Sequence, residues 1–108
     1  MVKKPILVTG VSGFIGSNLA RRLVGEGYPV VGLDYAAPGS DKQIPEGVQF
    51  HNVDIRTRDI APFFEGVDVV FHLAAKNSLG DCQKDPVGTM EINVVGTAQV
   101  FDAALKAG

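Results

Sequence analysis

The stretch Pro5-Ile-Leu-Val-Thr-Gly-Val-Ser-Gly-Phe-Ile-Gly16 decides the fold of this chain. Residues 5–9 form an apolar run that predicts a short buried strand, and apolar side chains then recur at helical spacing, at Ile15, Leu19 and Leu23. A glycine-rich turn between a strand and a helix predicts an anion site, because glycine lets a phosphate approach the backbone closely. The helix that follows presents unpaired N–H groups and the positive end of its dipole to the anion.

Three further apolar segments predict strands, at residues 29–33, 48–53 and 67–73. The polar residues 36–47, rich in Pro and Gly, predict a loop rather than a helix. Strands that alternate with helices predict an α/β fold with a parallel sheet and right-handed crossovers. The strands are apolar along almost their whole length, so we expect both faces of the sheet to be buried.

Two more helices are expected after the third and fourth strands. Residues 56–65 predict a short helix with Thr57 as its N-cap, although Pro62 within it argues against a regular helix. Residues 85–107 predict a long helix that Asp85 caps. Its apolar residues recur at helical spacing, at Met90, Val94, Ala98, Phe101 and Leu105.

Length, composition and charge limit the classes of protein to consider. A chain of 108 residues buries one core, so we expect a single domain over residues 1–108. The formal net charge is -2 and no cluster of Lys or Arg exceeds a pair, which argues against nucleic acid as a partner. No apolar run approaches the ~18 residues of a membrane span, so no membrane partner is expected. The single Cys82 cannot form an internal disulfide and predicts a reduced, cytoplasmic setting, with its thiol a bystander rather than a nucleophile.

An acidic residue ends the second predicted strand. Asp34 lies 18 residues after Gly16, where a carboxylate can accept hydrogen bonds from the 2′- and 3′-hydroxyls of an adenosine ribose. A carboxylate there repels a 2′-phosphate, and no Arg follows closely, so NAD is favoured over NADP. The alternative is that Asp34 only opens a turn.

Five motifs follow one another in the order typical of one protein family. They are Thr9-Gly10-x-x-Gly13-Phe14-Ile15-Gly16, Asp34, Asp54-Ile55, His72-Leu73-Ala74-Ala75 and Asn93-Val-Val-Gly96-Thr97. With them the chain resembles the extended short-chain dehydrogenase/reductase family, the NAD-dependent sugar-nucleotide epimerases and dehydratases. The resemblance implies part of a Rossmann-like, doubly wound parallel sheet, with about four strands in the order 3-2-1-4 and an end before the family's fifth strand.

The resemblance also implies a role for each matching residue. The pyrophosphate would lie against Gly10, Gly13, Phe14, Ile15 and Gly16. The adenine ribose would contact Asp34 and Tyr35, and the adenine would lie between Asp54 and Ile55, with the Asp54 carboxylate reaching its exocyclic amine. The cofactor would be walled by Leu73, Ala74 and Ala75, and Asn93 would help to position the active-site region.

Simpler interpretations stay open for some of these residues. Ile55 is also a plausible core residue, and Asn93 is a plausible partner for a neighbouring backbone. We expect His72 to be a structural histidine rather than an acid or base. Lys76 and Asn77 lie near the expected nicotinamide half without a defined role. No metal site is predicted.

The catalytic residues of the resembled family have no match in this chain. Those enzymes use a Ser or Thr and a Tyr-x-x-x-Lys pair, in which the Lys lowers the pKa of the Tyr for proton transfer. Four residues after Tyr28 and Tyr35 stand Gly32 and Gly39, so neither tyrosine fits. We therefore expect the N-terminal half of such a fold, without a substrate domain, that binds NAD but does not catalyse a reaction by itself. The alternatives are an enzyme half that needs a further part, and a folding unit without a ligand.

A homodimer is expected from the apolar surface that such a half would leave uncovered. The edge of the fourth strand would lack its usual neighbour, and an uncovered apolar edge favours pairing with another chain. A second side of the last helix is also apolar, at Ile92, Val95 and Val100. We expect a symmetric homodimer that covers both features.

Overall fold

Four apolar segments pair into one sheet in the computed structural model, which describes residues 2–35, 43–56, 59–76 and 79–108. The strands are β1 (Ile6–Thr9), β2 (Val30–Asp34), β3 (Val48–Asn52) and β4 (Val69–His72). All pairings are parallel, and the order β3-β2-β1-β4 confirms the predicted order 3-2-1-4. In this register Thr9 lies beside Leu33 on one side and His72 on the other, so the carboxyl ends of three strands meet at one edge.

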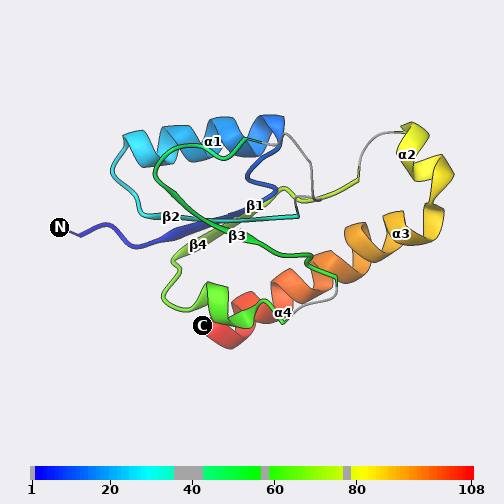
Figure 1. Ribbon diagram of the computed structural model, residues 1–108. Helices are drawn as coiled ribbons and strands as arrows, with labels where there is room; N and C mark the ends of the chain where they lie inside the picture. The colour runs from blue at the N-terminus through cyan, green and yellow to red at the C-terminus, as the bar shows by residue number, and fades with distance from the viewer. Residues whose placement is uncertain (1, 36–42, 57–58, 77–78) are drawn as a thin grey trace.

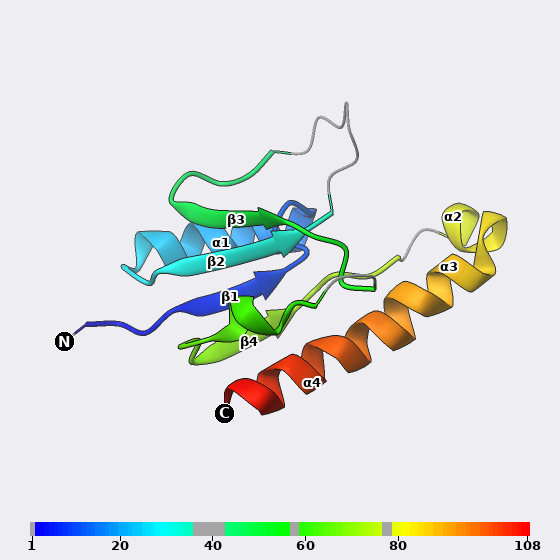
Figure 2. The same ribbon diagram turned by 60° about the horizontal axis from the view of Figure 1, so that its bottom comes forward.

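Helices lie on both faces of the sheet, which confirms the doubly wound α/β arrangement (Figure 1). One face is covered by α1 (Phe14–Gly25), and the other by η1 (Ala61–Phe64) and α4 (Thr97–Ala107). The chain passes from β4 to α4 through α2 (Leu79–Lys84), α3 (Pro86–Met90) and η2 (Glu91–Gly96). Figure 2 shows α3 and α4 in line, as one long rod beside β4.

A separate apolar cluster fills each face of the sheet. Under α1 the buried members are Val8, Val11, Ala20 and Val30. On the opposite face the buried members are Leu7, Leu33, Val53, Ile55, Ile60, Phe64, Val100 and Ala103. β1 contributes to both clusters because its successive side chains point to opposite faces.

The expectation that both faces of the sheet are buried is correct for β1 but wrong for β4. β1 is buried along its whole length, whereas Val69 and Phe71 of β4 are 41% and 37% exposed. The reason is position, because β4 is an outer strand of the described sheet and α1 packs over β1, β2 and β3. An apolar strand sequence does not distinguish a central strand from an outer one.

The apolar stripe of α1 is only in part its buried face. Leu19 and Leu23 are half-buried against the cluster under α1, but Ile15 is 67% exposed. The closest approach to the sheet is made instead by small residues, Gly16, Ser17 and Ala20. A small face lets the first turn of α1 lie directly on the glycine-rich turn.

The predicted helix over residues 85–107 forms as α3, η2 and α4 without a break. Its cap is confirmed, because Asp85 Oδ1 accepts a hydrogen bond from the Gly88 N–H at 3.0 Å. Residues 91–96, however, form a π-helical turn, which was not predicted. Such a turn carries more residues than an α-helical turn, so it rotates everything beyond it about the helix axis.

The buried side of the last helix is not its apolar stripe, which is exposed both before the π-helical turn, at Met90, and after it, at Phe101. Val100 is 2% exposed and lies in the core, so the expectation that it belongs to an uncovered second side is wrong. The uncovered side holds Phe101 and Leu105, which are 65% and 81% exposed.

Two short helices differ from the sequence-based expectation. The predicted helix over residues 56–65 is reduced to the 3-10 turn η1, with Pro62 in its first turn. Thr57, its predicted cap, lies outside the described residues. α2 was not predicted, because its six residues are too few to show helical periodicity.

Candidate functional site

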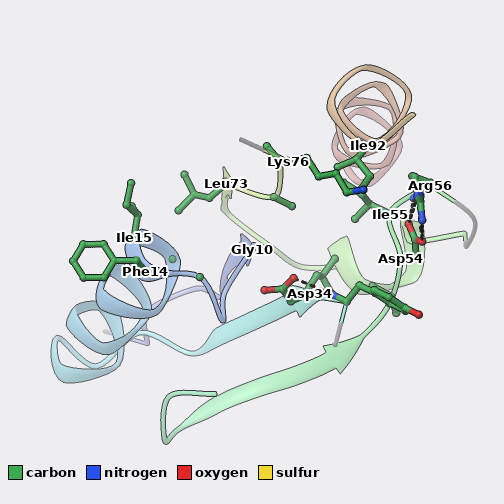
Figure 3. A pocket seen from close by; sticks show the side chains of 17 residues that line it. Gly10, Phe14, Ile15, Asp34, Asp54, Ile55, Arg56, Leu73, Lys76 and Ile92 are labelled. Atoms are coloured by element: carbon green, nitrogen blue, oxygen red, sulfur yellow. Dashed lines mark hydrogen bonds and ion pairs between the residues drawn. The ribbon is translucent and has the colours of Figure 1, made fainter. Parts of the chain in front are cut away.

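A cavity of about 690 Å³ opens at the carboxyl edge of the sheet (Figure 3). The glycine-rich turn contributes Gly10, Gly13, Phe14, Ile15 and Gly16. The end of β2 contributes Asp34, the residue after it is Tyr35, and the segment that follows β3 contributes Asp54 and Ile55. The segment that follows β4 contributes Leu73, Ala74 and Ala75. The structure therefore gathers every predicted site residue except Asn93 around one cavity, and the roles assigned to them stay predictions.

The glycine-rich turn is shaped by contacts that only glycine permits. Gly10 has a φ of +72° and donates its N–H to the Leu33 carbonyl at 2.8 Å. A Cβ on Gly16 would lie 2.1 Å from the Gly10 carbonyl oxygen. These contacts bring the N-terminus of α1 against the end of β1, beside the cavity.

No acidic side chain in the first turn of α1 offsets the positive end of the helix dipole. The N-cap of this helix is Gly13, which makes no side-chain capping bond. The first N–H groups of a helix have no partner within the helix and carry the positive end of its dipole. An anionic group in the cavity would supply the missing charge and acceptors.

The Asp34 carboxylate is tied to the glycine-rich turn. Asp34 Oδ2 accepts hydrogen bonds from the Ser12 N–H at 3.0 Å and from the Ser12 hydroxyl, and Oδ1 accepts from the Tyr35 N–H at 2.8 Å. These bonds fix the carboxylate at the rim of the cavity, next to the turn. Sequence analysis missed Ser12, because nothing in the spacing of Ser12 and Asp34 indicates that they meet.

Asp54 is bound by Arg56 two residues later (Figure 3). Arg56 Nη2 lies 2.7 Å from Asp54 Oδ2, and Arg56 Nε lies 3.0 Å from Oδ1. This guanidinium lowers the pKa of the Asp54 carboxyl below its ordinary value, and the carboxylate in turn raises the pKa of Arg56. Arg56 also lines the cavity, and sequence analysis assigned it no role.

A chain of hydrogen bonds, called the relay below, supports the cavity-lining segment that follows β4. The fully buried Thr9 hydroxyl oxygen accepts from the N–H groups of Leu73 at 2.9 Å and Ala74 at 3.1 Å. With both lone pairs used, it donates to His72 Nδ1 at 2.6 Å. His72 Nε2 therefore carries the proton, and donates it to the Thr97 hydroxyl at 2.9 Å.

The relay gives both ring nitrogens of His72 a hydrogen-bond partner, which agrees with the expectation of a structural histidine. The Thr97 hydroxyl passes its own hydrogen to the Asn93 carbonyl at 2.8 Å, within the π-helical turn. Burial lowers the pKa of His72, because the charged ring is poorly solvated there. β1, β4 and the last helix are thus joined through one imidazole.

Asn93 does not line the cavity itself, but it hydrogen-bonds the backbone of Lys76, which does. Its Oδ1 accepts from the Lys76 N–H at 2.8 Å, and its Nδ2 donates to the Lys76 carbonyl at 2.9 Å. This agrees with the interpretation that Asn93 faces a neighbouring backbone, and it gives the side chain a positioning role. Lys76 lines the cavity, whereas Asn77 lies outside the described residues.

Ile55 combines the two roles left open for it. It lines the cavity, and it is also 6% exposed and packs in the core. Three further apolar residues line the cavity without having been predicted, namely Leu33, Val53 and Ile92. Their apolar character alone does not separate them from other core residues.

Two classes of site find no support in the part of the chain that the structure describes. No group of three or more His, Cys, Asp or Glu in residues 2–35, 43–56, 59–76 and 79–108 is placed to hold a metal ion. Among the same residues no helix has the length and apolar character needed to cross a membrane.

Comparison with known proteins identifies relatives over almost the whole chain. The family model described as the NAD dependent epimerase/dehydratase family matches residues 6–108. A putative UDP-glucose 4-epimerase of Methanocaldococcus jannaschii is 37% identical over 103 residues, which is 94% of this chain and 34% of that protein. This chain thus spans about a third of the length of that curated relative.

Solved structures give the same result. An epimerase from Methanothermobacter thermautotrophicus superposes with a TM-score of 0.87 at 33% identity, over 98% of this chain and 33% of its own. UDP-glucose 4-epimerase from Thermus thermophilus, solved as a complex with NAD, gives a TM-score of 0.81 at 35% identity, over 96% of this chain and 34% of its own.

Proposed function

The chain belongs to the NAD dependent epimerase/dehydratase family, and from this membership we propose that it binds NAD across the carboxyl edge of its sheet. One observation carries the proposal: the uncapped N-terminus of α1 and the Asp34 carboxylate open on the same cavity. The first attracts a diphosphate, and the second accepts hydrogen bonds from ribose hydroxyls. A volume of about 690 Å³ suits a ligand of this size.

Each part of the dinucleotide would meet one segment of the cavity. The diphosphate lies against the N–H groups at the start of α1, and the adenine ribose lies against Asp34 and Tyr35. The adenine lies beside Asp54 and Ile55, and the remaining half follows the wall after β4. Relatives bind this cofactor, since the Thermus thermophilus enzyme is a complex with NAD.

The longer protein of which such a segment forms a third would modify a nucleotide sugar. The curated relative from Methanocaldococcus jannaschii is a putative UDP-glucose 4-epimerase, and NAD would supply the hydride acceptor in such a reaction. Residues 1–108 contain no Tyr-x-x-x-Lys pair for the accompanying proton transfer. We therefore assign this segment cofactor binding and no catalytic residue.

Asp34→Asn is expected to weaken NAD binding by about tenfold or more, since a hydrogen bond to a charged group contributes about 1.5–3 kcal/mol. Asn keeps the size of Asp, and its amide oxygen can still accept from Ser12, whereas its amide nitrogen can no longer accept from the Tyr35 N–H. NADP binding should change less, because the substitution also removes the charge that repels a 2′-phosphate. Calorimetric titration of both variants with NAD and NADP measures the effect.

The matched control is Asp68→Asn, because Asp68 is exposed and lies just before β4, at the opposite edge of the sheet. That variant should bind NAD like the wild type. If Asp34→Asn and the wild type bind NAD with equal affinity, Asp34 does not contact the ribose. If the wild type binds neither NAD nor ADP-ribose, the proposed function itself is contradicted.

The proposed macromolecular partner is a second copy of this chain, in a cytoplasmic setting that suits the single Cys82. Apolar side chains are exposed along β4, at Val69 and Phe71, and on the neighbouring α4, at Phe101 and Leu105. Size-exclusion chromatography with light scattering should give a dimer at micromolar concentration, and Phe101→Glu should give a monomer. Val2→Glu, at another exposed apolar position near the N-terminus, should stay dimeric, and a monomeric wild type would contradict this assembly.

A further inference from the structure

The ion pair of Asp54 and Arg56, called the fork below, lies at the cavity. Asp54 Oδ1 accepts from the Arg56 N–H at 2.9 Å and from Nε at 3.0 Å, and Oδ2 accepts from Nη2 at 2.7 Å. The two side chains are only 17% and 26% exposed. A planar guanidinium that binds a carboxylate through two parallel bonds fixes its plane as well as its position.

The two residues that follow Asp54 are also held in place. Gln99 of α4 donates its Nε2 to the Arg56 carbonyl at 2.8 Å. Ile55 packs directly on Gly96 at the end of the π-helical turn, where an added Cβ would lie 2.8 Å from the Ile55 Cδ1. The backbone that carries the fork is therefore anchored to the last helix.

The bound carboxylate still has capacity for one ligand group. A carboxylate offers about four acceptor sites, and three N–H groups of Arg56 engage Asp54, because the single Nε–H is shared between Oδ1 at 3.0 Å and Oδ2 at 3.2 Å. Asp54 lines the cavity, so its remaining site is available to a bound molecule. Because an ionised carboxylate has no hydrogen to donate, the group that meets it must be a donor.

We propose that Arg56 is a positioning residue that sets base specificity, because it holds Asp54 as a fixed acceptor for the exocyclic amine of adenine. This inference rests on the proposed NAD binding. Hypoxanthine carries a carbonyl oxygen where adenine carries the amine, and that oxygen would face the carboxylate with no hydrogen between them. A site built to bond a donor rejects an analogue that lacks it, because the buried acceptor is left unpaired. The fork thus selects adenine over hypoxanthine.

The test compares NAD with nicotinamide hypoxanthine dinucleotide by calorimetric titration. The wild type is expected to prefer NAD by about tenfold or more, as for loss of one hydrogen bond to a charged group. Arg56→Gln should bring this ratio close to one, mainly by weakening NAD, because Asp54 is then free to turn. Arg56→Lys should restore part of the preference, since an ammonium neutralises the carboxylate without the two-point grip.

The matched control is Arg22→Gln, which breaks the exposed Arg22–Glu26 pair on α1 and should leave the ratio unchanged. An Arg56→Gln variant that loses affinity for both dinucleotides equally would show that Arg56 only supports the fold, and would overturn the inference. Wild-type binding of NAD without preference over the hypoxanthine analogue would overturn this inference alone. Binding of neither dinucleotide would overturn the proposed function as well.

Discussion

Gly16→Ala is expected to lower the free energy of unfolding by about 3 kcal/mol, the upper end of the usual cost of overpacking. The added methyl group would lie 2.1 Å from the Gly10 carbonyl oxygen and 2.9 Å from its carbonyl carbon. Both atoms belong to the backbone, so no side chain can swing aside. Gly10 itself is fixed by its hydrogen bond to Leu33, and relief therefore requires α1 to move away from β1. Urea denaturation followed by circular dichroism measures the change.

Gly25→Ala is the control, because it makes the same substitution in the same helix. Nothing lies within 4 Å of an added Cβ at Gly25, the last residue of α1. Alanine favours the helix over glycine, so this variant should gain about 0.5 kcal/mol. Equal stability of the Gly16 variant and the wild type would mean that α1 does not rest on the turn as described.

The sequence predicted the sheet because its signals are local. Strand and helix periods, a glycine-rich turn and Asp85 as a cap act within a few residues, and these formed where expected except the helix over residues 56–65, which is reduced to η1. The strand order came from resemblance to a family rather than from periodicity. Local patterns could not give the neighbour of each strand. The uncovered edge of the fourth strand was expected only from the resemblance, and the exposure of Val69 and Phe71 on its face was not foreseen.

The residues that line the cavity were predicted more completely than the hydrogen bonds that hold them in position. Asp34 was found because it ends a predicted strand after the glycine-rich turn, and Leu73 was found through the resemblance to a family. Ser12 and Arg56 were missed because their roles depend on which side chain they meet in space. The π-helical turn was missed for a similar reason, since its phase shift shows only when the buried side of α4 is known.

Thr9→Val is expected to lower the free energy of unfolding by roughly 2–4 kcal/mol, because it keeps the shape of the side chain and removes the hydroxyl at the centre of the relay. The Leu73 N–H keeps the Thr9 carbonyl at 3.2 Å as a second acceptor. The Ala74 N–H and His72 Nδ1 lose the partner they have at Thr9, and each unsatisfied group costs about 1–3 kcal/mol. Thr89→Val, on the less buried α3, should cost less than about 1 kcal/mol in the same urea titration.

The pH dependence of stability is expected to separate the contribution of the relay from that of packing alone. Burial lowers the pKa of His72 in the folded chain, so the unfolded chain binds the proton more tightly. This contribution is complete above about pH 6.5 and is lost as the pH falls through the folded pKa. A protonated ring donates from both nitrogens, and Thr9 Oγ1 has no lone pair left to accept from Nδ1. The free energy of unfolding of the wild type should therefore decline below pH 6.5. His72→Gln has no imidazole to titrate and should show a shallower decline. Parallel curves for the two proteins would contradict the relay.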